Sequence, residues 1–268
     1  LGDVYKRQVR DYAYSWWPEG TGTAPNNKFF VQTGYYGISV NGSNGMINRI
    51  GALKDEYSQS EVMTQNASVI NSLPQVSTFS SVKINDDEYV FTDIIEPAQY
   101  NTINMRIIES GQYMQSFDAA AMIFADSSGK RTNSFIGRTE IKALPEYFAL
   151  NFQLFAQHDI ADATLTYSIA FSEERKGSPS QNGREIILKA PDGSGLSIIL
   201  PSQNASLSYE QASKTLTMSC SGISLKQYEF QGFGAIIIPS VSPSQADIEQ
   251  YNAIASLNTV SYTHLTLP

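Results

Sequence analysis

The 268-residue sequence contains a single cysteine, so no disulfide can form within the chain. Cys220 lies in the stretch KTLTMSC, where it alternates with Leu216 and Met218. This spacing predicts a small core residue rather than a reactive thiol. The scarcity of cysteine fits exported bacterial proteins as well as cytosolic ones, and it leaves the redox compartment open.

Basic residues are also scarce. The chain has 18 lysines and arginines against 26 aspartates and glutamates, a formal net charge of −8. A nucleic-acid binder needs a basic stripe to neutralise phosphates, and a membrane-surface protein needs a polybasic patch. The sequence has neither, and no apolar run approaches the roughly 20 residues that span a bilayer. We therefore expect no nucleic-acid partner and no membrane.

Only two histidines are present. No histidine or cysteine pair has zinc-ligand spacing, and the stretches ADSSG and PDGSG lack the repeated carboxylates of a calcium loop, so both indicate turns. The pattern Gly-x-Ser-x-Gly is missing, and His158 lies in the polar stretch FAQHDIAD, which predicts a loop. We expect no metal and no cofactor.

What the sequence does contain is a period of two. YFALNFQLF and ATLTYSIAF alternate apolar and polar residues, as strands with one buried face do. Polar turns such as INDDEY, ADSSGK and APDGSG separate these runs. Helices are missing from between the strands, which excludes a parallel β/α fold. The prediction is an all-β protein, a large antiparallel β-sandwich with two short helices.

The two helices are predicted near the chain's first quarter and its end. Apolar residues recur at helical spacing from Ser58 to Ser72. The second helix is expected to begin with Ser242 as the N-cap, Pro243 in the first helical position and Gln245 in a capping box. Glu174 to Arg184 is expected to form either a long hairpin loop or a boundary between two halves.

Aromatic residues gather in DYAYSWWPEG, which holds both tryptophans, Trp16 and Trp17. Flat aromatic rings stack on the C–H-rich faces of sugars, and nearby carboxylates accept hydrogen bonds from sugar hydroxyls. The stretch therefore predicts either a sugar-binding surface or an edge strand whose aromatics pack into the core.

Charged residues interrupt the apolar pattern between Asn104 and Phe124. A hairpin there would bring Glu109 and Asp118 together, and hydrolysis of a glycosidic bond uses two carboxylates about 5 to 10 Å apart. Both are candidate catalytic residues, with Arg106 and Tyr113 as candidate substrate-binding neighbours. The alternative is that they are solvated or ion-paired strand residues. GRTEIKALPEYF adds Arg138, Glu140 and Glu146, which predict a polar strand face.

The stretches DVYKRQ and SYTHLTLP stand at the two ends of the chain. Both resemble translated read-through of sequencing adapters. On that resemblance residues 1–8 and 259–268 are expected to be artefacts, and His264 is set aside. Residues 9–258 then form one β-sandwich domain, a fragment of a longer protein.

FVQTGYYGISVN, RIIESGQYMQSFD and ALPEYFALNFQL resemble the β-supersandwich of galactose-mutarotase-like domains, as found before the helical barrel of six-hairpin glycosidases. The resemblance implies an accessory, non-catalytic domain of a larger carbohydrate-active protein, whose catalytic carboxylates belong to a C-terminal barrel. The resemblance favours a periplasmic or extracellular location. For such a domain we expect polysaccharide contacts through the residues singled out above, Trp16, Trp17, Tyr113 and Arg106. Aldose epimerases of this fold use a histidine pair and a glutamate, whereas only His158 is available here.

Two other interpretations stay open. A polysaccharide lyase or glycosidase would use Glu109 and Asp118 within the sandwich, which requires both carboxylates on one sheet face. A structural, adhesin-like surface protein would need no aromatic groove.

Overall fold

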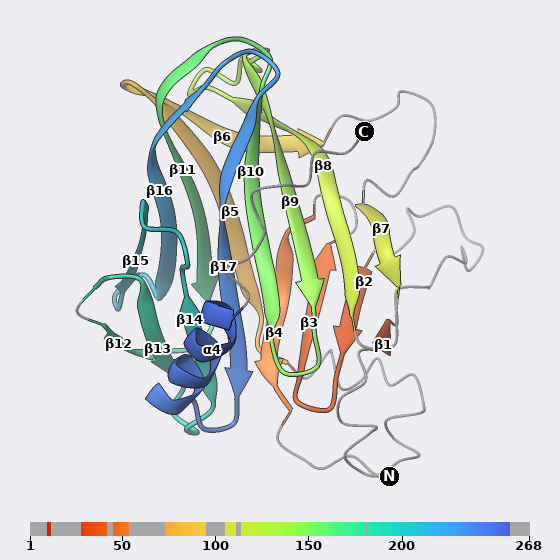
Figure 1. Cartoon of the computed structure of the whole chain (residues 1–268), viewed down its shortest axis with the longest axis vertical. Helices are drawn as coiled ribbons and strands as arrows, with labels where there is room; N and C mark the ends of the chain where they lie inside the picture. The colour runs from red at the N-terminus through yellow and green to blue at the C-terminus, as the bar shows by residue number, and fades with distance from the viewer. Residues whose placement is uncertain are drawn as a thin grey trace.

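The computed structural model describes residues 10–11, 28–41, 45–53, 73–94, 105–110, 114–180 and 182–257. Every strand pairing in this part of the chain is antiparallel, which confirms the predicted all-β class (Figure 1). A four-stranded sheet, in the order β1-β2-β3-β4, comprises β1 (Arg10–Asp11), β2 (Lys28–Gln32), β3 (Tyr36–Asn41) and β4 (Ile47–Ala52).

A 13-stranded sheet forms most of the molecule, in the order β12-β13-β14-β17-β10-β9-β8-β6-β5-β11-β16-β15, with β7 paired to β8. Its strands are β5 (Val76–Ile84), β6 (Asp87–Ile94), β7 (Met105–Ser110), β8 (Gln115–Ala125), β9 (Phe135–Ala143), β10 (Phe148–Ala156), β11 (Ile160–Phe171), β12 (Lys176–Pro179), β13 (Glu185–Lys189), β14 (Gly195–Ile199), β15 (Ala205–Glu210), β16 (Thr215–Leu225) and β17 (Phe230–Ser240).

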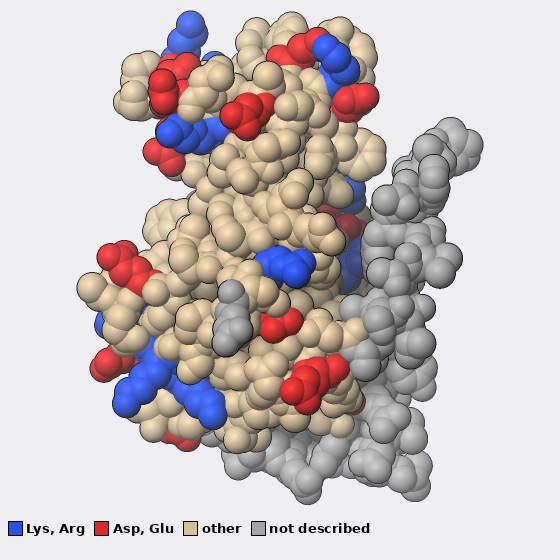
Figure 2. Space-filling model, turned by 60° about the vertical axis from the view of Figure 1, so that its left-hand side comes forward, with Lys and Arg blue, Asp and Glu red and all other residues tan. Residues whose placement is uncertain are grey.

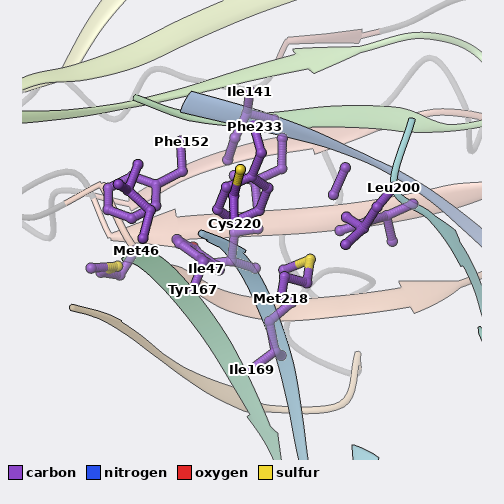
Figure 3. Close-up of a cluster of buried hydrophobic side chains, with 14 of the residues drawn as sticks. Met46, Ile47, Ile141, Phe152, Tyr167, Ile169, Leu200, Met218, Cys220 and Phe233 are labelled. Atoms are coloured by element: carbon purple, nitrogen blue, oxygen red, sulfur yellow. The ribbon is translucent and has the colours of Figure 1, made fainter. Parts of the chain in front are cut away.

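The large sheet curls until its two edge strands approach each other. Gly177 of β12 lies against Tyr209 of β15 so closely that a Cβ on the glycine would come within 2.8 Å of the ring. The two halves of the sheet thereby face each other across one core, as Figure 1 shows. Phe152 of β10 contacts the rings of Tyr167 in β11 and Phe233 in β17, each at a centroid distance of 6.1 Å (Figure 3).

Alternation along the strands fills this core, as the sequence predicted. In β9 and β10 every second residue is buried, and in β11 the same pattern runs from Ala163 to Phe171. Because successive strand side chains point to opposite sides of a sheet, one side of each strand packs inward and the other is left for surface chemistry. Cys220 is 2% exposed within the core, and burial raises the pKa of its thiol.

The four-stranded sheet is fastened to the large one by Tyr36 of β3. Its ring is fully buried against Phe148, and its hydroxyl lies 2.7 Å from the carbonyl oxygen of Leu144 and 2.8 Å from that of Tyr147. The hydroxyl donates to this pair of carbonyls in the β9–β10 turn, which satisfies a polar group that would be costly to bury alone. Burial raises the pKa of Tyr36 well above its ordinary value.

The predicted turns are confirmed. Asn85, with φ of 55°, opens the two-residue turn between β5 and β6, a position where asparagine tolerates a left-handed backbone. Asp126 accepts from the backbone amides of Ser128 and Lys130, and Asp192 accepts from that of Ser194. These carboxylates close the loops in which they lie, as the turn prediction requires.

One helix, α4 (Gln245–Leu257), follows the last strand and packs through Ile248 on Ile199 and Ile236. The predicted N-cap at Ser242 is wrong by two residues. The backbone amide of Ser244 donates to Asp247 Oδ2 at 2.8 Å, so the capping interaction uses the acidic residue of the first turn. The helix predicted over residues 58–72 lies outside the described residues.

The segment predicted as a loop from Glu174 to Arg184 is partly a strand. Residues Lys176–Pro179 pair with Ile186 to Lys189, so the segment forms part of a β-hairpin, which agrees with the hairpin alternative. The residue before it, Arg175, is 2% exposed.

The sandwich has two outer faces of different character. The polar face is the outer side of β8, β9 and β10, and it comprises Ser116, Asp118, Arg138, Glu140, Lys142 and Asn151. The hydroxyl face is the outer side of β5, β11, β16 and β15, and two of its cross-strand rows are Ser81-Thr166-Ser219-Ser206 and Phe79-Ser168-Thr217-Ser208. Figure 2, turned to bring the side of β15 and β16 forward, shows an uncharged band between the charged groups at the top and those of the lower half.

Candidate functional site

The polar face places three functional side chains side by side on three strands. In the backbone register Asp118 of β8 is opposite Glu140 of β9, which is opposite Asn151 of β10. Directly opposed residues share one side of an antiparallel sheet, here the side away from the core residues Ile141 and Leu150. Two carboxylates and an amide therefore lie in one row.

Asp118 and Arg138 form the strongest interaction of the face. Arg138 Nε lies 2.7 Å from Asp118 Oδ2, a charge-assisted hydrogen bond. The Asp118 side chain is fully buried, whereas the Arg138 side chain is 37% exposed. A buried carboxylate without a cation would be costly, so the pair holds the guanidinium in one place while part of it still faces water.

Glu140 lies at the centre of the network. Its Oε1 accepts a hydrogen bond from Ser116 Oγ at 3.2 Å and lies 3.6 Å from Lys142 Nζ and 4.0 Å from an outer nitrogen of Arg138. Its Oε2 accepts from Asn151 Nδ2 at 3.3 Å. The side chain is 12% exposed, so the carboxylate is oriented by several donors and remains within reach of a small ligand group.

A glycine on the next strand makes room for this arrangement. Gly234 of β17 is opposite Asn151, and a Cβ added to Gly234 would lie 2.8 Å from Asn151 Oδ1. The amide therefore occupies space that a side chain at position 234 would restrict. Its Nδ2 is directed to Glu140 because its oxygen lies over the glycine.

The chemistry of this face suits hydroxyl-bearing ligands. Carboxylates accept hydrogen bonds from hydroxyls, and guanidinium, ammonium and amide groups donate to them. The four charged side chains, Asp118, Glu140, Arg138 and Lys142, balance to zero. Over the residues that the structure describes, no group of three or more His, Cys, Asp or Glu side chains could hold a metal ion. No helix in that same part of the chain is long and apolar enough to cross a bilayer.

Of the residues predicted from the sequence, Asp118 belongs to this network. The backbone register places Arg106 opposite Asp118 and Glu109 opposite Ser116, but the side chains of Arg106 and Glu109 are outside the described part. Trp16, Trp17 and Tyr113 are also outside it, and their assignment to sugar contacts stays a prediction.

Sequence reasoning grouped Arg138 and Glu140 as a polar strand face but did not connect them to Asp118. The signal was available, because the stretches around Asp118 and Glu140 are adjacent predicted strands. Ser116 and Asn151 were missed, since a lone polar residue in a strand carries no mark of its partner. His158 is exposed in the loop between β10 and β11, as predicted, and Glu146 is exposed in the β9–β10 turn.

No protein-family model matches the chain, and no curated protein matches it. Among solved structures, the heparan sulfate lyase HepC from Pedobacter heparinus aligns with a TM-score of 0.46 and 11% identity, over 83% of this chain and 37% of that one. This chain thus spans well under half of the lyase's length.

Two further structures are of similar size to this chain. A putative aldose 1-epimerase from Escherichia coli K12 has a TM-score of 0.44 and 8% identity, over 80% of this chain and 98% of that one. A galactose mutarotase-like protein from Lactobacillus casei has a TM-score of 0.43 and 6% identity, over 79% and 99%. No site residue is carried over from any of the three.

Proposed function

We propose that this chain is an accessory, non-catalytic β-sandwich domain of a larger carbohydrate-active protein, and that it contacts polysaccharide through the polar face. The observation that carries the proposal is the network of Asp118, Arg138, Glu140 and Asn151 on an outer sheet surface. The buried Asp118 holds Arg138 in place, and the partly exposed Arg138, Glu140 and Asn151 present hydrogen-bond donors and acceptors. The resemblance of the sequence to galactose-mutarotase-like sandwiches supports the same assignment.

The burial of Asp118 favours a binding role over catalysis. A general acid or base must lie within hydrogen-bond reach of the group it protonates or deprotonates. Asp118 is fully buried and bonded to Arg138, which makes it a positioning group for the guanidinium. The competing candidate is catalysis by Glu109 and Asp118, and the register that places Glu109 opposite Ser116 on the neighbouring strand is the observation in its favour.

Affinity electrophoresis of the full chain in gels containing neutral or acidic polysaccharides tests the proposal. We expect at least one polysaccharide to retard the chain. Glu140→Gln keeps the shape of the side chain but removes its charge, and it should weaken retention about tenfold, the loss of one charge-assisted hydrogen bond. Glu210→Gln makes the same chemical change on β15 and should leave retention unchanged.

Three results would contradict this proposal. The first is an absence of retardation by every polysaccharide tested. The second is cleavage of a retarding polysaccharide by the chain, abolished in Asp118→Asn, which would replace a binding domain by the lyase or glycosidase alternative. Equal retention of the Glu140→Gln and Glu210→Gln variants would remove the polar face from the binding site.

A further inference from the structure

Two exposed aromatic side chains and a partly buried one cluster at the end of the molecule opposite α4, where β16 turns into β17 (Figure 1). Tyr228 is 70% exposed and Phe230 is 62% exposed. Phe155 of β10 is directly opposite Phe230 in the register, and its ring lies 6.5 Å from that of Tyr228 with an interplanar angle of 34°. We call Phe155, Tyr228 and Phe230 the aromatic shelf.

The backbone of the shelf is strained. Tyr228 has φ of 70°, a left-handed conformation that is uncommon for a bulky residue. Its amide donates to the carbonyl oxygen of Ala156 at 2.7 Å, which ties the turn to the end of β10. Strain of this kind persists only where neighbouring contacts enforce it, and such positions cluster at ligand-binding sites.

The carboxylate of Asp159 holds the turn that contains Tyr228 in its left-handed conformation. Asp159, between β10 and β11, accepts hydrogen bonds from Lys226 Nζ and from the amide of Gln227, each at 2.9 Å. Glu229 closes the same turn by accepting from the amide of Lys226 at 2.8 Å. Hydrogen bonds to Asp159 and Glu229 thus fix the turn that carries the exposed rings. A binding site that is fixed in advance loses less entropy when a ligand binds.

The shelf is continuous with the polar face. Moving two residues along β10 from Phe155, about 7 Å of strand, leads to Gln153. Gln153 is opposite Arg138 on one side and Gly232 on the other. The next outward residue is Asn151, which belongs to the network around Glu140. A ligand resting on the rings therefore has hydrogen-bonding groups beside it, and the network's charges cancel.

We infer that the aromatic shelf is a subsite for an uncharged sugar ring of a polysaccharide whose neighbouring unit lies on the polar face. The C–H face of the sugar packs on Tyr228 and Phe230, and its hydroxyls reach Gln153 and Arg138. This inference rests on the proposed function, and it adds the class of ligand and the place where the chain of sugars begins.

The test uses the neutral polysaccharide that retards the full chain most strongly. Phe230→Ala removes one ring, and Tyr228→Asn removes another while keeping a residue that tolerates the left-handed backbone. Each should weaken binding about threefold to tenfold, as expected for loss of an aromatic stacking contact. Phe79→Ala, which removes a 56% exposed phenylalanine from the hydroxyl face, should have no effect.

Two further readouts make the test decisive. In the unaltered protein, titration with the polysaccharide should shift the amide NMR signals of Gln227 and Tyr228. Binding should also be the same at low and high salt, because no charges are neutralised. If Phe230→Ala and Tyr228→Asn bind the polysaccharide normally while Glu140→Gln binds it more weakly, the shelf is not a sugar subsite. That result leaves the proposed function standing. Failure to bind any polysaccharide overturns both, and binding that salt abolishes overturns the uncharged ligand.

Discussion

The two outer faces of the sandwich are built on the same alternation and carry opposite chemistry. On the hydroxyl face the cross-strand rows named above consist of serines and threonines apart from Phe79, and two pairs of them hydrogen-bond. Ser168 Oγ lies 3.3 Å from Thr217 Oγ1, and Ser206 Oγ lies 3.0 Å from Ser219 Oγ. On the polar face, the outward position of β8 holds the buried carboxylate of Asp118.

The difference between the two faces separates residues that folding stability explains from residues that it does not explain. Hydroxyls that pair across strands need no partner elsewhere, and β-branched threonine favours a strand, so the hydroxyl face is explained by folding alone. A buried carboxylate gains nothing in stability over an apolar residue of similar volume. Among the described residues, the polar face has such a carboxylate in Asp118 and the hydroxyl rows have none, and this contrast is what the proposed binding role explains.

The largest expected effect comes from breaking the buried pair. Asp118→Ala leaves Arg138 without its carboxylate, and it should lower the free energy of unfolding by about 2 to 3 kcal/mol, because the guanidinium can regain water only in part. Ser168→Ala on the hydroxyl face should cost about 0.5 kcal/mol or less. Urea unfolding of both variants measures the two losses in the free energy of unfolding. Similar losses at the two sites would contradict the difference between the faces.

A smaller loss of stability is expected from substitution of Gly234, which lies next to the Asn151 amide. Gly234→Ala places a Cβ near Asn151 Oδ1 and should cost about 1 kcal/mol, with weaker polysaccharide binding, because the amide must leave Glu140. In the double variant Gly234→Ala with Asn151→Ala the clash is gone. A double-mutant cycle in thermal or urea unfolding should therefore show strong coupling. Additive losses would mean that Gly234 serves only the backbone.

The smallest effect concerns pH at the shelf. The hydrogen bond from Lys226 lowers the pKa of Asp159 below its ordinary value. A folded-state pKa below the unfolded one means that the interaction stabilises the native turn above the unfolded pKa, and that this contribution is lost as pH falls through the folded value. The hydroxyl pairs of the hydroxyl face contribute no such dependence, since serine and threonine do not titrate.

Lys226→Gln should move the pKa of Asp159 up towards its ordinary value, which NMR titration of the carboxyl carbon measures. The amide signals of Tyr228 should follow the same titration in the unaltered protein, whereas those of Thr217 should not. An unchanged pKa in the variant would show that the Gln227 amide alone holds the carboxylate.

Much of the fold could be predicted from the sequence, because period-two alternation reports burial directly. It identified β10 and β11, the inward position of Cys220, and the turns at Asn85 and Asp192. The strand Lys176–Pro179 escaped because all four of its residues are exposed, so it has no apolar side to detect. Capping at Ser244 was missed because aspartate, as well as glutamate or glutamine, can complete the cap.

The candidate site could be predicted only in part, since contacts between strands depend on register. The charge of Asp118 among apolar residues identified it as a candidate. The residues near it in the sequence, however, do not predict that Arg138 is its partner. Arg175 is a similar case. It was assigned to a loop, but its guanidinium lies 4.6 Å from the ring centroid of Phe171 in a buried position, and burial lowers its pKa. Such packing follows from tertiary structure rather than from a local pattern.

The position of β17 also has a consequence for biosynthesis. Of the described strands of the sheet, β17 is the last to leave the ribosome, yet it lies between β14 and β10 and pairs Phe148 with Ile237. Until it arrives, both neighbours present open edges, and the aromatic core around Phe152 lacks Phe233. Folding must therefore wait for a long-range closure, which slows it and leaves the nascent chain dependent on protection from aggregation.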